Sequence, residues 1–212
     1  MAADDRDAGL VEELEFERPS VADVHEVLRA HRSLLAHFSS YPPMDSGHGE
    51  SPAYPENLIG VFNRQCPGGI CCSTFSASDK LDAGVNVSGY IGVLLRPASN
   101  RSIVAVALGD VGSRYLNGRR EFSMPLGPVT RTDLDKSIRD RSEADWNEWI
   151  VDDYEPIGII TLGVGAAYGK GTQSPEQLFE IFGYPVYRFE DGQLVRLHGD
   201  RWIPADHGDL YP

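Results

Sequence analysis

Short runs of β-branched and apolar residues, punctuated by glycine, proline and asparagine, constrain the fold of this chain more than any other feature of its sequence. Their length and punctuation predict strands rather than helices. The segment PASNR, which follows the third run, predicts a hairpin turn between the third and fourth strands. The six runs cover residues 57–64, 70–76, 88–96, 102–109, 120–126 and 156–163.

The carboxyl-terminal part of the sequence adds further strands. Residues 186–204, VYRFEDGQLVRLHGDRWIP, predict a meander of three short strands. Asp191-Gly192 within this segment is a strong signal for a tight turn. We interpret Asp206, His207 and Asp209, which follow, as part of a frayed tail.

Helices are fewer. Ser20 with Asp23, and Thr132 with Asp135, place a side-chain cap before apolar residues at helical spacing. A third helix follows a glycine-rich segment and has its own cap. The predicted helices cover residues 21–38, 132–150 and 175–182.

These elements predict an α+β fold. Most strands follow one another without a helical crossover, which favours a largely antiparallel sheet with an N-terminal helix, a central acidic helix and a C-terminal β meander. Residues 1–19 carry seven carboxylates against two arginines, which predicts an acidic flexible tail. We expect residues 20–212 to form a single domain, with a long loop at 41–55 that contains four prolines and two glycines.

The net charge limits the partners that the chain can bind. At −13, the charge disfavours nucleic acid and anionic membrane surfaces, because either would require a basic patch. A small molecule or a basic protein remains compatible with it. The acidic amino terminus lacks the features of a secretory signal, and an odd number of cysteines favours free thiols, so we expect a cytoplasmic protein.

The segment GIITLGVGAAYGKGTQSPEQLFEIFG, residues 158–183, is the first candidate binding site. The segment contains an apolar run, then a glycine-rich loop with one lysine, then a capped helix. Phosphate sites have their elements in this order. Ser174 and Gln177 form a capping box, and Gly183 ends the helix. The candidate ligand-binding residues are Gly165, Gly169, Lys170, Gly171 and Thr172.

The spacing of this segment departs from known nucleotide motifs. A phosphate-binding P-loop needs glycine where Val164 stands and a hydroxyl where Gly171 stands. The dinucleotide pattern needs a small residue at Tyr168. Two interpretations therefore stay open, a flexible connection between a strand and a helix, and an anion or nucleotide contact with another geometry. The residues identify no particular cofactor.

Cysteine chemistry is the second candidate. Cys66, Cys71 and Cys72 lie within seven residues, and Cys66 is the candidate nucleophile, although a cysteine nucleophile needs a base supplied by the fold. Adjacent cysteines on a strand point to opposite faces, and the Cys-x-x-Cys spacing of zinc sites is absent. Buried, unreactive thiols are the alternative.

Three short patches resemble ADP-ribosyltransferases. Arg64, Ser73-Thr74 and Glu121 follow the order of the Arg, Ser-Thr-Ser and Glu residues of that family, which implies Glu121 as the catalytic glutamate. Phe75 replaces the last serine, and Arg119 stands where glutamine or glutamate would precede the catalytic residue by two. Arg64 also lies closer to the serine pair than in the family, so the chain is not assigned to it.

A cluster of carboxylates supports a different function. Asp152, Asp153 and Glu155 could gather a divalent cation, but their spacing lacks the pattern of a calcium loop, and a solvated acidic turn is the alternative. Trp149 breaks the apolar stripe of the predicted helix and could be an exposed contact residue. Together these four residues are the candidate partner-binding face.

Two hypotheses follow. The first is an intracellular enzyme or small-ligand-binding domain, including one for a phosphorylated or nucleotide-like ligand, whose pocket is rimmed by loops 41–55, 64–72 and 163–174. The alternative is a non-catalytic acidic interaction protein, such as an inhibitor or immunity-type partner of a basic protein. Neither a reaction nor a substrate follows from the sequence.

Overall fold

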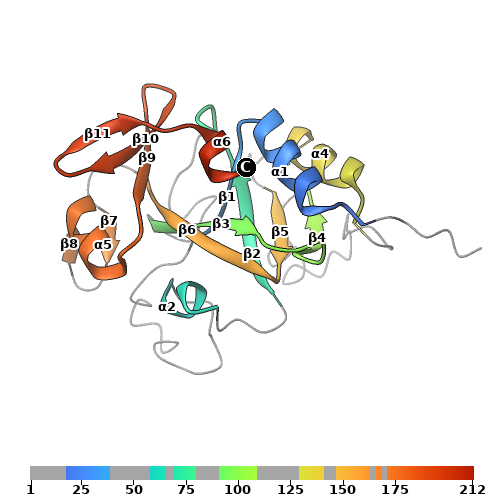
Figure 1. The fold of residues 1–212 in the computed structure, drawn as a ribbon, viewed down its shortest axis with the longest axis horizontal. Helices are drawn as coiled ribbons and strands as arrows, with labels where there is room; N and C mark the ends of the chain where they lie inside the picture. The colour runs from blue at the N-terminus through green and yellow to red at the C-terminus, as the bar shows by residue number, and fades with distance from the viewer. Residues whose placement is uncertain are drawn as a thin grey trace, which may run out of the picture.

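The computed structural model describes residues 18–38, 58–64, 69–79, 91–108, 129–140, 147–162, 166–168 and 171–212. They form a mixed α+β structure on a nine-stranded, mostly antiparallel sheet (Figure 1). The strand order is β11-β10-β9-β6-β3-β1-β2-β5-β4, and within the described chain only β6 and β9 pair in parallel.

The elements have the following bounds. The helices are α1 (Val21–Ala30), α2 (Leu58–Phe62), α4 (Arg131–Arg139), α5 (Pro175–Phe182) and α6 (His207–Leu210). The strands of the large sheet are β1 (Leu34–Phe38), β2 (Ile70–Phe75), β3 (Ile91–Pro97), β4 (Ile103–Ala107), β5 (Glu148–Val151), β6 (Tyr154–Thr161), β9 (Val186–Glu190), β10 (Gln193–His198) and β11 (Arg201–Pro204). A separate two-stranded ribbon pairs β7 (Ala166–Tyr168) with β8 (Gly171–Gln173).

Several predicted elements are confirmed. Strands β2, β3, β4 and β6 occupy the predicted runs, and the meander β9-β10-β11 turns at Asp191-Gly192, where both residues have positive φ. Helix α5 has the predicted capping box and ends at Gly183 in the left-handed conformation. The run at 120–126, the loop at 41–55 and residues 1–17 of the predicted tail lie outside the described residues, and the division into a tail and one domain stays a prediction.

The predicted hairpin between β3 and β4 is wrong. The turn exists, because Ser102 Oγ accepts hydrogen bonds from Ala98 N and Ser99 N, each 2.9 Å long. However, β3 pairs with β6 while β4 pairs with β5. Ala98 N donates to Asp153 O at 3.1 Å, so the two connections lie side by side. The β3–β4 and β5–β6 segments therefore form one long antiparallel ladder that bends at these turns.

The large sheet curls around an aromatic core. Phe75 on β2 packs edge-on against Phe38 on β1 and Phe189 on β9, with ring centroids 5.3 and 5.9 Å away. Three strands separate β2 from β9 in the sheet order. Direct contact between these strands therefore requires a strongly coiled sheet, as twisted strands produce.

Helix α1 is shorter than predicted. It begins with the predicted Ser20–Asp23 capping box but ends at Ala30 rather than at residue 38. Ser33 N donates to Leu28 O at 2.8 Å and Arg32 N donates to Arg29 O at 3.0 Å, which is the hydrogen-bond pattern of a Schellman motif. Residues 34–38 form β1, and all five are buried. The prediction failed because a fully buried strand also contributes continuous apolar residues.

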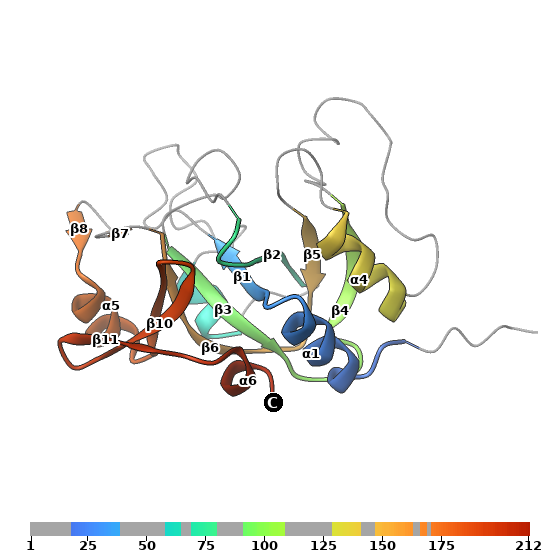
Figure 2. The ribbon, with the colours of Figure 1, turned by 90° about the horizontal axis from the view of Figure 1, so that it is seen from above.

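The central acidic helix is also shorter than predicted. Its capping box is formed by Thr130 and Asp133, two residues before the predicted pair Thr132 and Asp135. The helix ends at Arg139. Residues 148–151 belong to β5 instead. Helices α1 and α4 lie together (Figures 1 and 2), and Arg131 on α4 forms ion pairs of 2.9 and 2.8 Å with Asp23 and Glu26 on α1.

Two further predictions are wrong. The run at 57–64 contains the short helix α2 rather than a strand, and Phe62 on this helix stacks against Phe182 and Tyr184. The chain after β11 is not a frayed tail, because it forms α6 and Tyr211 is fully buried. Apolar contacts with residues distant in the sequence determine the conformation of both segments.

None of the helices in the described part of the chain has the length and the apolar character that a transmembrane helix needs.

Gly158 on β6 gives a test of the fold. A Cβ at this position would lie 2.5 Å from Cε2 of Tyr187, so we expect Gly158→Ala to lower the free energy of unfolding by about 1–3 kcal/mol. Urea denaturation would measure it. Gly208→Ala is the matched control, because its added Cβ would have no atom closer than 3.5 Å; equal losses in the two variants would contradict the close approach of β6 to Tyr187.

Candidate functional site

The predicted ligand-binding and catalytic residues are only partly described. Cys66, Gly165, Gly169 and Lys170 lie outside the described residues. Gly171 and Thr172 belong to β8, where they pair with Tyr168 and Ala167 of β7. The two open interpretations of the glycine-rich loop are therefore both untested.

The cysteine prediction is confirmed in one respect. Cys71 is exposed and Cys72 is buried, as expected for adjacent residues on one strand. Cys72 Sγ faces the carbonyl of Ile70 at 3.7 Å. Among the residues that the structure describes, no three or more His, Cys, Asp and Glu side chains are grouped so that they could hold a metal ion.

The predicted partner-binding face is not a continuous exposed surface. Trp149, a candidate exposed contact residue, is instead fully buried on β5, and its Nε1 donates to Ser137 Oγ at 2.8 Å. Asp153 forms an ion pair with Arg64 at 2.9 Å, and Glu155 forms one with Arg96 at 2.7 Å. Asp152 is exposed.

The residues that resemble ADP-ribosyltransferases have structural roles where they are described. Thr74 is buried, and its backbone N and Oγ1 both donate to Oδ1 of Asn147, at 2.9 and 3.0 Å. Arg64 is exposed and paired with Asp153. Glu121 lies outside the described residues.

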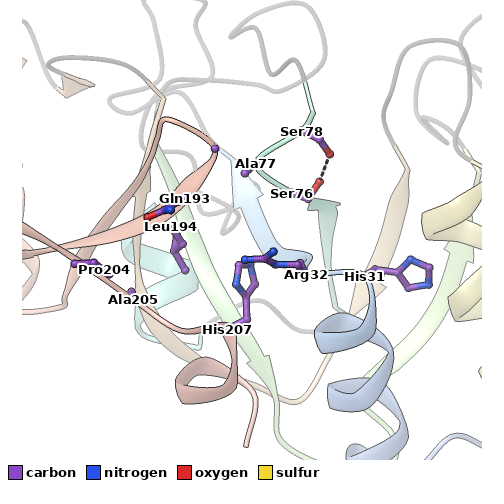
Figure 3. A pocket seen from close by; sticks show the side chains of 11 residues that line it. His31, Arg32, Ser76, Ala77, Ser78, Gln193, Leu194, Pro204, Ala205 and His207 are labelled. Carbon is purple, nitrogen blue, oxygen red and sulfur yellow. Dashed lines mark hydrogen bonds between the residues drawn. The ribbon is translucent and has the colours of Figure 1, made fainter.

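A pocket of about 410 Å³ opens where the curled sheet brings the meander opposite the beginning of β1 and the end of β2 (Figure 3). Side chains from segments far apart in the sequence converge on it, so no single motif could have revealed it. We call it the Arg32 pocket. It is lined by His31, Arg32, Ser76, Ala77, Ser78, Gly192, Gln193, Leu194, Pro204, Ala205 and His207.

Arg32 occupies a backbone conformation that favours glycine. Its φ is 47°, at the position after the end of α1 where the Schellman motif usually carries glycine. Helix α5 follows the usual pattern and has Gly183 there. Within the described parts of the chain, Arg32 takes part in no ion pair. A strained residue with an unneutralised guanidinium in a pocket indicates a functional site.

His207 lies beside Arg32 and contributes an unsatisfied polar atom. Its Nε2 is buried and has no hydrogen-bond partner. Burial lowers the pKa of His207, the positive charge of Arg32 lowers it further, and Asp206 and a backbone hydrogen bond to Arg32 oppose these effects. His31 contributes differently, because its ring turns away from the pocket (Figure 3) and its Nε2 lies 2.8 Å from Oδ1 of Asp135.

The remaining walls supply hydroxyl groups and an apolar surface. Ser76 and Ser78 share a hydrogen bond of 2.9 Å between their hydroxyl oxygens (Figure 3). Ser76 N donates to Asp79 Oδ2 at 2.6 Å. Leu194 and Pro204 belong to the facing meander. The pocket therefore combines a guanidinium, a buried imidazole and hydroxyls, which are groups that bind anionic oxygens.

Sequence reasoning missed both central residues. Arg32 gave no signal, because it lay inside a predicted helix. His207 was noticed but interpreted as part of a frayed tail. Asp206, whose side chain accepts from Gly208 N at 2.9 Å, and the apolar pair Leu210-Tyr211 after it were signals for a short docked helix.

The strain at Arg32 leads to a stability prediction. We expect Arg32→Gly to raise the free energy of unfolding by about 0.5–1 kcal/mol. Glycine adopts positive φ without steric cost, and this gain outweighs the greater conformational entropy that glycine loses on folding. Arg101→Gly is the matched control, since Arg101 is an exposed arginine without positive φ and should gain nothing. A loss of stability in Arg32→Gly would show that the guanidinium holds the fold.

The environment of His207 leads to a pH prediction. Its lowered pKa means that the unfolded chain takes up the imidazole proton at higher pH than the folded protein. Stability should therefore fall as pH decreases from about 6.5, the ordinary value for histidine, towards the lower value of the folded state. Urea denaturation at several pH values should show a shallower fall in His207→Gln. An unchanged slope would contradict the buried, neutral imidazole.

Comparison with known proteins gives no further assignment. No protein-family model, no curated protein and no solved structure matches the chain. The function must therefore be argued from the geometry and chemistry of its own residues.

Proposed function

We propose that this chain is a binding domain for a small molecule that carries an anionic group, either a carboxylate or a phosphoryl group. The group is held in the Arg32 pocket between Arg32 and His207. One observation carries the proposal: an arginine without an ion pair among the described residues is kept in a strained conformation beside the buried, unpartnered Nε2 of His207. An anionic oxygen pairs with the guanidinium of Arg32, and it accepts a hydrogen bond from His207 Nε2 when that nitrogen carries a proton.

The pocket suits a polar ligand of modest size. A planar guanidinium donates two parallel hydrogen bonds to carboxylate or phosphoryl oxygens. Ser76, Ser78 and Gln193 provide neutral groups for the rest of the ligand, and Leu194 gives it an apolar surface. A few polar groups on a partly apolar wall are typical of small-molecule sites.

Binding is proposed rather than catalysis because of the hydroxyl geometry. An activated serine needs a base within hydrogen-bond reach. In this pocket Ser76 Oγ pairs with Ser78 Oγ instead of with a histidine. The sequence-based hypothesis of a phosphorylated or nucleotide-like ligand names the same class of ligand as this proposal. The Arg32 pocket, however, is lined by other segments than loops 41–55, 64–72 and 163–174.

Binding of anions to the pocket can be tested with inorganic phosphate and with acetate. Spectra of the histidine side-chain nitrogens should show saturable changes at His207 during the titration. We expect Arg32→Gly to weaken binding about tenfold or more, which corresponds to about 1.4 kcal/mol, while the protein stays folded.

Arg101→Gly makes the same change in net charge away from the pocket and should bind as the unchanged protein does. If neither anion shifts the His207 signals, or if both glycine variants lose binding equally, the proposal is wrong. His207→Gln distinguishes the contribution of the imidazole from that of the guanidinium.

A further inference from the structure

Helix α5 carries exposed apolar residues on both sides of its buried face. Leu178 is fully buried, and Phe182 stacks against Phe62 with ring centroids 4.8 Å apart, so this face packs on the core. Phe179 and Ile181 flank it on opposite sides and are 51% and 49% exposed. A large exposed apolar side chain indicates a site of interaction where it borders a groove.

Phe179 lines a groove of about 540 Å³ between α5 and the β10–β11 turn, which we call the α5 groove. Pro185 and Leu197 form the rest of its apolar surface. The α5 groove does not share a lining residue with the Arg32 pocket. An exposed aromatic ring at a groove is a typical contact point for an apolar side chain of a protein partner.

The charges around the α5 groove select the partner. Glu176 and Glu180 line it, and in the described chain neither carboxylate forms an ion pair. Arg196, which also lines the groove, hydrogen-bonds the side chain of Tyr187. Two carboxylates against one guanidinium leave the α5 groove with a net negative charge beside Phe179, on a chain whose net charge is −13.

We propose that the α5 groove binds a basic segment of another protein that inserts an apolar side chain against Phe179. The carboxylates of Glu176 and Glu180 attract its lysine or arginine residues, and burial of the Phe179 ring supplies most of the affinity. The acidic interaction face then lies on α5 and not at the β5–β6 turn, because Asp153 and Glu155 at that turn already form ion pairs. It does not depend on the Arg32 pocket.

A short amphipathic helical peptide of leucine and lysine, labelled with a fluorophore, is the probe. Fluorescence anisotropy should show saturable binding that weakens about tenfold in Phe179→Ser. Val104→Ser is the matched control, because Val104 on β4 is 52% exposed and β4 lies on the opposite side of the structure from α5 (Figures 1 and 2). Equal binding by these two variants would overturn the proposal.

A second pair of variants separates local attraction from the overall charge. Glu176→Gln with Glu180→Gln should weaken peptide binding severalfold, whereas Asp152→Asn with Glu155→Gln makes the same change in net charge and should leave it unchanged. Equal weakening would show attraction to the chain as a whole and overturn the proposal. Self-association that disappears in Phe179→Ser, measured by sedimentation, would assign the groove to a second copy of the chain instead.

Discussion

A buried asparagine holds together the parts of the structure on which the Arg32 pocket depends. Asn147 is fully buried, and its Nδ2 donates to Thr74 Oγ1 at 2.7 Å and to Ser137 O at 2.9 Å. Trp149 Nε1 completes the arrangement by donating to Ser137 Oγ. These bonds fix β2, α4 and β5 relative to one another, and β2 leads directly into Ser76. Buried polar groups that are fully hydrogen-bonded favour one packing over its alternatives.

The other wall of the pocket depends on the end of the chain. The hydroxyl of Tyr211 accepts a hydrogen bond of 2.8 Å from Leu35 N, and Arg29 donates to Tyr211 O at 2.8 Å. Both contacts join residues more than 170 positions apart in the sequence. They hold α6 against α1 and so place His207 beside Arg32. The two central residues of the pocket are brought together by packing, and the local sequence around either one does not specify the site.

The same distinction explains what the sequence could predict. Local signals were sufficient for the meander, for the Asp191-Gly192 turn and for α5, whose cap and terminator are both standard residues. They were insufficient for α1, because arginine rather than glycine stands at its end. They were also insufficient for β5, because no glycine or proline separates it from α4 in the sequence. The α+β class was predicted because it depends on the balance of strands and helices, whereas the Arg32 pocket required the long-range pairing of strands.

The Arg32 pocket and the α5 groove use different parts of one strand. Gln193 and Leu194 at the beginning of β10 line the pocket, and Leu197 and His198 at its end line the groove. Strand β10 pairs with β9 on one side and β11 on the other along this length. Coupling between two sites requires an element with two discrete arrangements, and a strand bonded on both edges lacks that freedom. A ligand in the pocket and a partner in the groove would therefore bind with independent free energies.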